Sequence, residues 1–292
     1  MQTKYIVAVS GGVDSVVLLH KIMSVKPDNI TYIVAHFDHG IRDDSAEDAE
    51  FVKALAKKYK SEFVCERAEL GKNSSEDEAR NRRYGFLHRV KNKYKAEAII
   101  TAHHRDDVIE TMLVNILRGT GPRGLIGYTQ VNILRPLISK TKKELRSYAK
   151  KHDLKWREDS TNLDQKYLRN YIRINLVPEL SKSDKARLLE IREGLQEKYI
   201  EIDSLSKKFL VQVMRRGEIK RSSFITLPYI VQKEIIATSL RLENVEINKE
   251  MVERAVIAIK TLATGKHVEL KKHVTLYSRP ETVLLKITPQ SV

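Results

Sequence analysis

The strongest constraint on the fold is found at the amino terminus, where two apolar runs flank a loop rich in glycine and serine. The first run, residues 6–9, predicts a buried strand, and the second, residues 16–20, predicts a buried helix. The loop between them reads Ser10-Gly11-Gly12-Val13-Asp14-Ser15. A strand that turns directly into a helix through such a loop is typical of an α/β fold.

The loop has the chemistry of a phosphate site. Backbone N–H groups in a tight turn, together with the positive end of the next helix, attract a multiply charged phosphate. Glycine allows the close approach because it has no Cβ. The Gly-Lys-Ser/Thr ending of a P-loop is absent, which favours attack at the α-phosphate with pyrophosphate as the leaving group. We therefore predict nucleotide binding, and the alternative is an ordinary strand–turn–helix corner.

Composition limits the class of protein. With 292 residues and 41% hydrophobic residues, the chain is long enough for two globular domains. The sequence has no apolar stretch of the roughly 18 residues that a membrane helix requires, and the first apolar run is too short for a signal peptide, so we predict a cytoplasmic protein. The single cysteine, Cys65, excludes an internal disulfide within the sequence and is predicted to lie in a strand.

The charge balance points to a polyanionic partner. The 53 Lys and Arg residues exceed the 38 Asp and Glu residues, which gives a net charge of +15. Nucleic acid is the usual partner of so basic a chain, and a merely basic surface is the alternative. Because the basic clusters are spread along the sequence, they favour a broad footprint on a folded RNA.

Predicted strands and helices alternate through the first half of the chain. After the first strand and helix, we expect strands at 30–37, 62–66 and 96–101, and helices at 45–59, from a capping box at Ser75, and at 106–117. This alternation predicts a doubly wound parallel sheet. Ligands bind at the carboxyl ends of such strands, where the glycine loop and residues 35–39 and 102–107 all lie.

The second half of the chain has a different pattern. Thr141 is predicted to cap a helix that ends near residue 153. Beyond Pro178, a long amphipathic helix spans about 188–213 and two shorter helices follow at 231–242 and 250–262. Alternating runs at 268–270, 274–276 and 283–287 predict a small terminal sheet. We expect two domains, 1–181 and 182–292, the second mainly helical.

Two groups of charged residues are candidates for chemistry. Asp107 and Glu110 are three residues apart, so they lie on the same side of a helical first turn. They could hold Mg²⁺ or receive an ammonium group, or simply stabilise the positive end of the helix. Arg169 and Arg173 share a helix face and are either surface cations or ligands of an α-phosphate. Residues 117–125 are expected to form a cationic loop.

As a set, the motifs resemble the N-type ATP pyrophosphatases and, within them, the tRNA(Ile)-lysidine synthetase family. The resemblance covers roughly residues 4–180. Asp38 stands where the family often has asparagine, and longer members carry a further C-terminal domain. The glycine loop is joined by the following motifs: His36-Phe37-Asp38-His39-Gly40-Ile41-Arg42, Arg80-x-x-Arg83-Tyr84-x-Phe86-Leu87, Ala102-His103-His104-x-x-Asp107-x-x-Glu110-Thr111, Leu117-Arg118-Gly119-x-Gly121, Arg135-Pro136-Leu137, Asp159-x-x-Asn162 and Arg169-Asn170-x-x-Arg173.

The resemblance implies a two-step reaction on the tRNA(Ile) with anticodon CAU. ATP adenylates the wobble cytidine at its carbon-2 oxygen and releases pyrophosphate; the ε-amine of free lysine then displaces AMP to form lysidine. It implies ATP and Mg²⁺ as cofactors and a homodimer; the lack of a long apolar stretch predicts that the protein has no membrane partner. Asp14 would bind Mg²⁺, Asp107 and Glu110 would recognise the lysine amine, and the reacting phosphate and base would lie near Arg83, His103 and Arg173. The nucleotide would contact Ala35, Phe37 and the loop, residues Ser10, Gly11, Gly12, Val13, Asp14 and Ser15.

Other functions use the same scaffold. A tRNA thiolase needs cysteines for sulfur transfer or an iron–sulfur cluster, and Cys65 is the one cysteine in the sequence. A non-catalytic RNA-binding protein would bind tRNA with a steep salt dependence and would not turn over ATP. NAD and GMP synthetases share the loop but not the basic balance or the histidine–carboxylate set.

Overall fold

The computed structural model describes residues 2–40, 45–68, 76–128, 130, 132–158, 168–215, 217–243 and 245–288. They form two compact units, Met1–Leu195 and Gln196–Val292. The division falls inside the long helix α8 (Lys182–Val213). The predicted domain boundary at 181/182, where α8 begins, stays a prediction.

A five-stranded parallel sheet forms the centre of the first unit. Its strand order is β3-β2-β1-β4-β5, and all four pairings are parallel. The predicted doubly wound α/β fold is therefore confirmed, and Cys65 lies in a strand as expected. The strands are β1 (Thr3–Ala8), β2 (Ile30–Asp38), β3 (Glu62–Arg67), β4 (Ala98–Ile100) and β5 (Ile133–Leu134).

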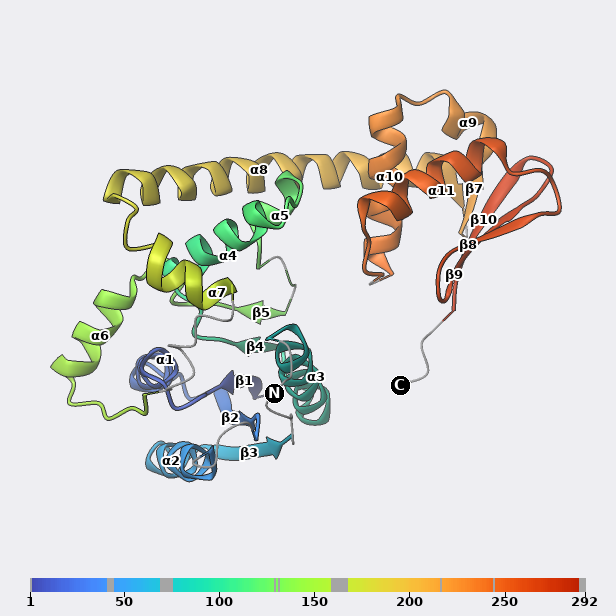
Figure 1. The fold of residues 1–292 in the computed structure, drawn as a ribbon. Coiled ribbons are helices and arrows are strands. Elements are labelled where there is room, and N and C mark those ends of the chain that lie inside the picture. Colours follow the sequence, from blue (N-terminus) through green and yellow to red (C-terminus); the bar gives the residue numbers. More distant parts are fainter. Residues whose placement is uncertain are drawn as a thin grey trace. The chain divides into compact units, whose positions relative to one another are not determined.

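Helices cover both faces of this sheet (Figure 1). One face packs against α1 (Val13–Ser24), α2 (Ser45–Lys58) and α6 (Lys142–Lys151), and the other against α3 (Glu76–Tyr94). Neighbouring side chains of a strand point to opposite faces, so Val7 packs with α1 whereas Ile6 packs with α3. Burial on both faces explains why the strands are apolar runs without alternation.

Shorter helices follow β4 and lead to α8. They are α4 (Arg105–Leu117), α5 (Pro122–Ile126), α7 (Leu168–Tyr171) and the π-helical turn η2 (Ile172–Leu176). The prediction of a loop over residues 117–125 was wrong for residues 122–125, because these belong to α5. Gly121 is the N-cap and Pro122 occupies the first helical position, where its missing N–H costs no hydrogen bond.

The second unit contains the rest of α8, then α9 (Arg221–Ile225), α10 (Tyr229–Leu242) and α11 (Lys249–Thr261). Its antiparallel sheet has the order β6-β7-β10-β9-β8. The predicted helices and terminal strands are confirmed as α10, α11, β8 (His267–Lys271), β9 (Val274–Ser278) and β10 (Thr282–Ile287). Two further strands, β6 (Met214–Arg215) and β7 (Glu218–Lys220), are too short to produce a sequence pattern.

The apolar core of the second unit lies between α10, α11 and this sheet. Phe224, Ile235 and Leu276 are fully buried there. Within the described ranges, none of the helices combines the length and the apolar character needed to cross a bilayer.

Candidate active site

The glycine loop forms a tight turn after β1. Gly11 has a φ of +91°, and a Cβ built on it would lie 3.5 Å from both Phe51 and Val52. The Gly11 N–H donates to Ser15 Oγ at 3.2 Å, and Ser15 Oγ donates to the Gly12 carbonyl at 2.8 Å. The loop therefore needs glycine at position 11 for its backbone conformation.

The amino end of α1 faces this turn without a side-chain cap. Gly12 is the N-cap residue and has no side chain that could accept from the first-turn N–H groups. The N–H groups of a helix start and the helix dipole together favour a bound anion. The backbone N–H of Arg157 donates to the Gly11 carbonyl at 3.0 Å, and this hydrogen bond connects the loop to the segment that follows α6.

Asp14, in the first turn of α1, has two unlike oxygens. Its Oδ2 accepts from Lys142 Nζ at 2.5 Å and lies 3.6 Å from His104 Nε2. Its Oδ1 is buried and has no hydrogen-bond partner within the described part of the chain. Burial opposes the negative charge of Asp14, but His104 and Lys142 outweigh it and lower the pKa of the carboxyl.

His104 connects this carboxylate to α4. It is the N-cap of the helix: its backbone N–H donates to Asp107 Oδ2 at 2.9 Å, and its Nδ1 accepts from the Asp107 N–H at 3.4 Å. Its Nε2 lies 3.5 Å from Asp107 Oδ2 and faces Asp14. Burial opposes protonation of the ring, but Asp14 and Asp107 raise the pKa of His104. The role of His104 could not be predicted from the sequence.

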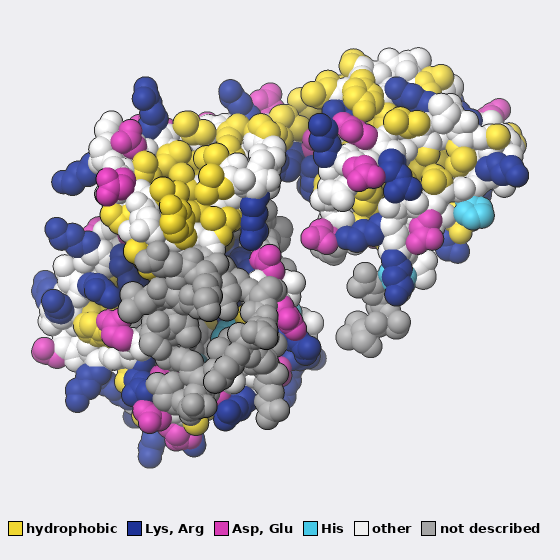
Figure 2. Space-filling view, in the orientation of Figure 1, with side chains coloured by type: hydrophobic (Ala, Val, Ile, Leu, Met, Phe, Trp, Pro, Cys, Tyr) yellow, Lys and Arg dark blue, Asp and Glu magenta, His cyan; other side chains and the backbone are white. Residues whose placement is uncertain are grey.

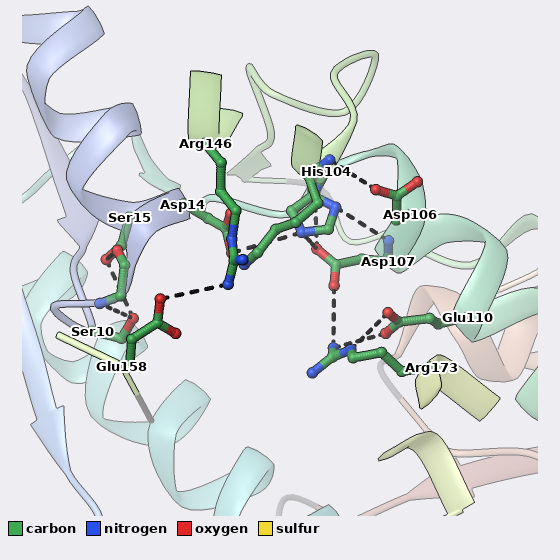
Figure 3. Close-up of polar contacts among 12 residues, drawn as sticks. Ser10, Asp14, Ser15, His104, Asp106, Asp107, Glu110, Arg146, Glu158 and Arg173 are labelled. Carbon is green, nitrogen blue, oxygen red and sulfur yellow. Dashed lines mark hydrogen bonds and ion pairs between the residues drawn. The ribbon is translucent and has the colours of Figure 1, made fainter. Parts of the chain in front are cut away.

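Two arginines hold Glu110: Arg169 of α7 and Arg173 of η2, and Figure 3 shows the contact with Arg173. Arg173 donates to its two oxygens, each at 2.8 Å, and Arg169 donates at 3.1 Å. Both guanidinium groups also lie within 4 Å of Asp107 Oδ1. Burial alone would raise the pKa of Glu110, but Arg173 and Arg169 lower it. The shared partners confirm that Asp107 and Glu110 lie on the same side of α4.

Asp107 behaves differently from Glu110. Its burial, with the neighbouring charge of Glu110, raises the pKa of the Asp107 carboxyl, although His104 and Arg169 oppose this shift. Two carboxyls on one turn thus have pKa values shifted in opposite directions, which is typical of a functional site.

His103 is surrounded by positively charged side chains. Its Nδ1 is 2.8 Å from Thr101 Oγ1, and its ring is 4.8 Å from the Tyr128 ring. Burial and the surrounding arginines, Arg83 foremost, lower the pKa of His103 to about 2. Burial also lowers the pKa of the Arg83 guanidinium. In the described ranges Arg83 has no ion pair with a carboxylate, so the surroundings of His103 have an excess of positive charge that suits an anionic ligand.

Ala35 and Phe37, predicted to contact the nucleotide, are buried at the carboxyl end of β2. The Ala35 carbonyl accepts from the Val9 N–H at 2.9 Å, and the Phe37 ring packs 5.6 Å from that of Phe86. Their role in nucleotide binding stays a prediction. Several predicted motif or capping residues lie outside the described residues: Ile41, Arg42, Ser75, Asp159 and Asn162.

The residues around Asp14 suit Mg²⁺ bound chiefly by substrate. Among the described residues there is no group of three or more His, Cys, Asp or Glu side chains that could hold a metal. Mg²⁺ commonly uses one or two carboxylates and completes its shell with phosphate oxygens and water. The buried, unpartnered Oδ1 of Asp14 fits that pattern, so Asp14 would hold the ion; this role remains a prediction.

The fold and the loop together define the class of protein. A model of the PP-loop domain matches residues 1–180. The chain therefore belongs to the PP-loop family, which implies ATP binding.

More particular relatives are tRNA(Ile)-lysidine synthases. The one from Thermus thermophilus is 38% identical over 230 residues, which is 73% of this chain and 45% of the relative. The one from Clostridium tetani is 30% identical over 291 residues, which is 93% of this chain and 62% of the relative. The chain thus spans about half of the length of these curated relatives.

A solved structure shares the fold. The U34-tRNA thiolase NcsA from Methanococcus maripaludis, solved with its 4Fe–4S cluster, is similar with a TM-score of 0.57 and 18% identity. The match covers 67% of this chain and 72% of that one. At this identity, the similarity concerns the fold alone.

Proposed function

We propose that the protein ligates lysine to carbon-2 of the wobble cytidine in the tRNA(Ile) with anticodon CAU. ATP would adenylate the carbon-2 oxygen and release pyrophosphate, and the lysine ε-amine would then displace AMP. The observation that carries the proposal is the continuous chain of contacts from Asp14 through His104 and Asp107 to Arg173 and Glu110. These contacts connect the glycine loop, which would hold the phosphates, to Asp107 and Glu110, which would receive the attacking amine. The names of the relatives supply the substrate.

For the first step, the loop and the uncapped start of α1 would hold the phosphates as negative charge moves to the leaving pyrophosphate. Mg²⁺ bound at Asp14 would neutralise part of that charge. Arg83 and the neutral ring of His103 belong to the positively charged cluster described above and would orient the α-phosphate and the base. Preorganised cations of this kind stabilise a transition state because they need no reorganisation.

For the second step, the amine must lose a proton before or while it attacks. Asp107 is the carboxylate whose pKa burial raises, which makes it the stronger base of the pair. Glu110 is bound by two guanidinium groups and would recognise the lysine ammonium only as Arg173 moves toward a phosphate. This arrangement would favour adenylation before amine binding.

The test is incorporation of labelled lysine into a tRNA(Ile) transcript with anticodon CAU, with and without ATP and Mg²⁺. The methionine tRNA that shares this anticodon is the control. ATP-dependent label on the isoleucine tRNA alone supports the proposal. Pyrophosphate release that depends on tRNA, without label on the tRNA, would indicate that the nucleophile of the second step is not lysine. The absence of both signals would refute an enzymatic function and leave an RNA-binding protein.

A further inference from the structure

Lys142 lies outside the motifs that carry the family resemblance, yet its side chain reaches Asp14 of the glycine loop, which would hold the phosphates. It is the first residue of α6, after the N-cap Thr141, whose capping box with Glu144 fixes where the helix begins. The backbone N–H of Lys142 donates to Asp106 Oδ2 at 2.7 Å. The start of α6 is thereby anchored to the first turn of α4, beside the glycine loop.

The side chain of Lys142 crosses to α1. Its Nζ donates to Asp14 Oδ2 at 2.5 Å, although the two residues are 128 positions apart in the sequence. The Lys142 side chain is 40% exposed and that of Asp14 is 24% exposed. The ion pair is thus only partly buried, and a ligand arriving from solvent can reach the ammonium of Lys142. Lys142 can therefore contact a ligand as well as Asp14, and its position calls for an explanation beyond this ion pair.

The chemistry of the glycine loop supplies that explanation. In P-loop proteins a lysine within the loop contacts the β- and γ-phosphates, and this loop has none. Lysine binds phosphate as a mobile point charge on a flexible stem. If Mg²⁺ takes the Asp14 carboxylate, the ammonium of Lys142 loses its partner at the place where the phosphates arrive.

We propose that Lys142 is a phosphate ligand of the PP loop, paired with Asp14 until Mg²⁺ and nucleotide arrive and then bound to the leaving pyrophosphate. The inference rests on the proposed ATP-dependent function. It assigns to α6 the task that the loop lysine performs in P-loop proteins. AMP lacks the β- and γ-phosphates, so its binding should not depend on Lys142.

The test compares Lys142→Gln, Lys142→Arg and the matched control Lys143→Gln. Lys143 is the next residue of α6, is exposed, and makes no ion pair with the described residues. Binding of ATP, pyrophosphate and AMP is measured by calorimetry at a fixed Mg²⁺ concentration, and melting temperatures confirm folding. We expect Lys142→Gln to weaken binding of ATP and pyrophosphate about tenfold or more, since a charged hydrogen bond is lost. The affinity of Lys142→Gln for AMP should stay within about twofold of the wild-type value, and so should the affinities of the Lys143→Gln control for all three ligands. Lys142→Arg should retain most of the wild-type affinity for ATP and pyrophosphate.

Two results would overturn the inference. One is unchanged binding of ATP and pyrophosphate by a folded Lys142→Gln protein. The other is equal weakening for AMP, which would indicate a distorted site. If the wild-type protein binds ATP but does not incorporate lysine, the proposed ligation fails while the binding comparison still decides the role of Lys142. If the wild-type protein binds neither ATP nor pyrophosphate, both ideas are wrong.

Discussion

At the scale of single residues, His103 shows how strongly the surroundings control a titratable group. Four arginines and burial hold its pKa at about 2, below the ordinary value of about 6.5. The ring is therefore neutral throughout the physiological range. A neutral imidazole can accept or donate a hydrogen bond next to a phosphate or a base without adding charge.

This shift predicts a pH dependence of stability. Below about pH 6.5 the unfolded chain binds a proton that folded His103 cannot bind, so the free energy of unfolding falls as pH decreases toward 2. The loss due to His103 is up to about 1.4 kcal/mol per pH unit. The measurement is denaturant unfolding at pH 7 and pH 5, followed by the fluorescence of the single tryptophan, Trp156. His103→Gln should flatten the dependence and the exposed control His267→Gln should not; equal slopes for wild type and His103→Gln would contradict the assigned pKa.

Glu110 carries a second prediction at this scale. Glu110→Gln removes the charge that neutralises Arg169 and Arg173, so the free energy of unfolding should fall by roughly 1–3 kcal/mol. In the ligation assay we expect the KM for lysine to rise about tenfold while adenylated tRNA still forms. The exposed Glu97→Gln serves as the control. A KM for lysine equal to that of the wild type would remove Glu110 from the amine site.

At the scale of elements, the turn between β1 and α1 is the most demanding part of the chain. Gly11 combines a positive φ with apolar neighbours at 3.5 Å from a built Cβ. Gly194, in the middle of α8, offers a matched contrast, because a Cβ there would meet nothing within 4 Å. Substitution of the two glycines by alanine should therefore change the free energy of unfolding in opposite directions.

Gly11→Ala should reduce the free energy of unfolding by about 1–2 kcal/mol, because alanine at this φ is strained, and should weaken ATP binding. Gly194→Ala should raise the free energy of unfolding by up to about 1 kcal/mol, because alanine is the better helix former. Thermal unfolding and ATP calorimetry test both. A Gly11→Ala protein with wild-type melting and ATP affinity would show that the backbone of this turn does not shape the phosphate cradle.

At the scale of the whole molecule, the net charge of +15 is the dominant property. Figure 2 shows Lys and Arg side chains scattered over the visible face of each unit instead of gathered in one strip. A dispersed positive surface favours many weak contacts with an RNA backbone over a single groove-reading element. Binding of tRNA through such contacts releases counterions.

The affinity for tRNA should therefore depend steeply on salt. Each neutralised phosphate contributes roughly 0.7–0.9 to the slope of log affinity against log salt. We expect a loss of at least about tenfold between about 50 and 200 mM salt, measured by fluorescence anisotropy with labelled tRNA. Binding of AMP, which carries one phosphate, is the control with a shallow dependence. A salt-independent affinity for tRNA would contradict a broad electrostatic footprint.

The sequence by itself determined the parts of this protein that arise from neighbouring residues. The glycine loop, the apolar strands, the capping box at Thr141 and the shared face of Asp107 and Glu110 all follow from spacings of a few positions. Short elements such as β6, β7 and α5 were missed, because two to five residues do not show a period.

The tertiary structure alone decided which distant side chains share the site. Lys142 reaches Asp14 across 128 positions, and Arg173 reaches Glu110 across 63. The pKa of about 2 at His103 also depends on arginines that the fold brings together from separate elements. Local pattern encodes backbone conformation, whereas contacts and electrostatic fields depend on distances in space, which the arrangement of the elements sets.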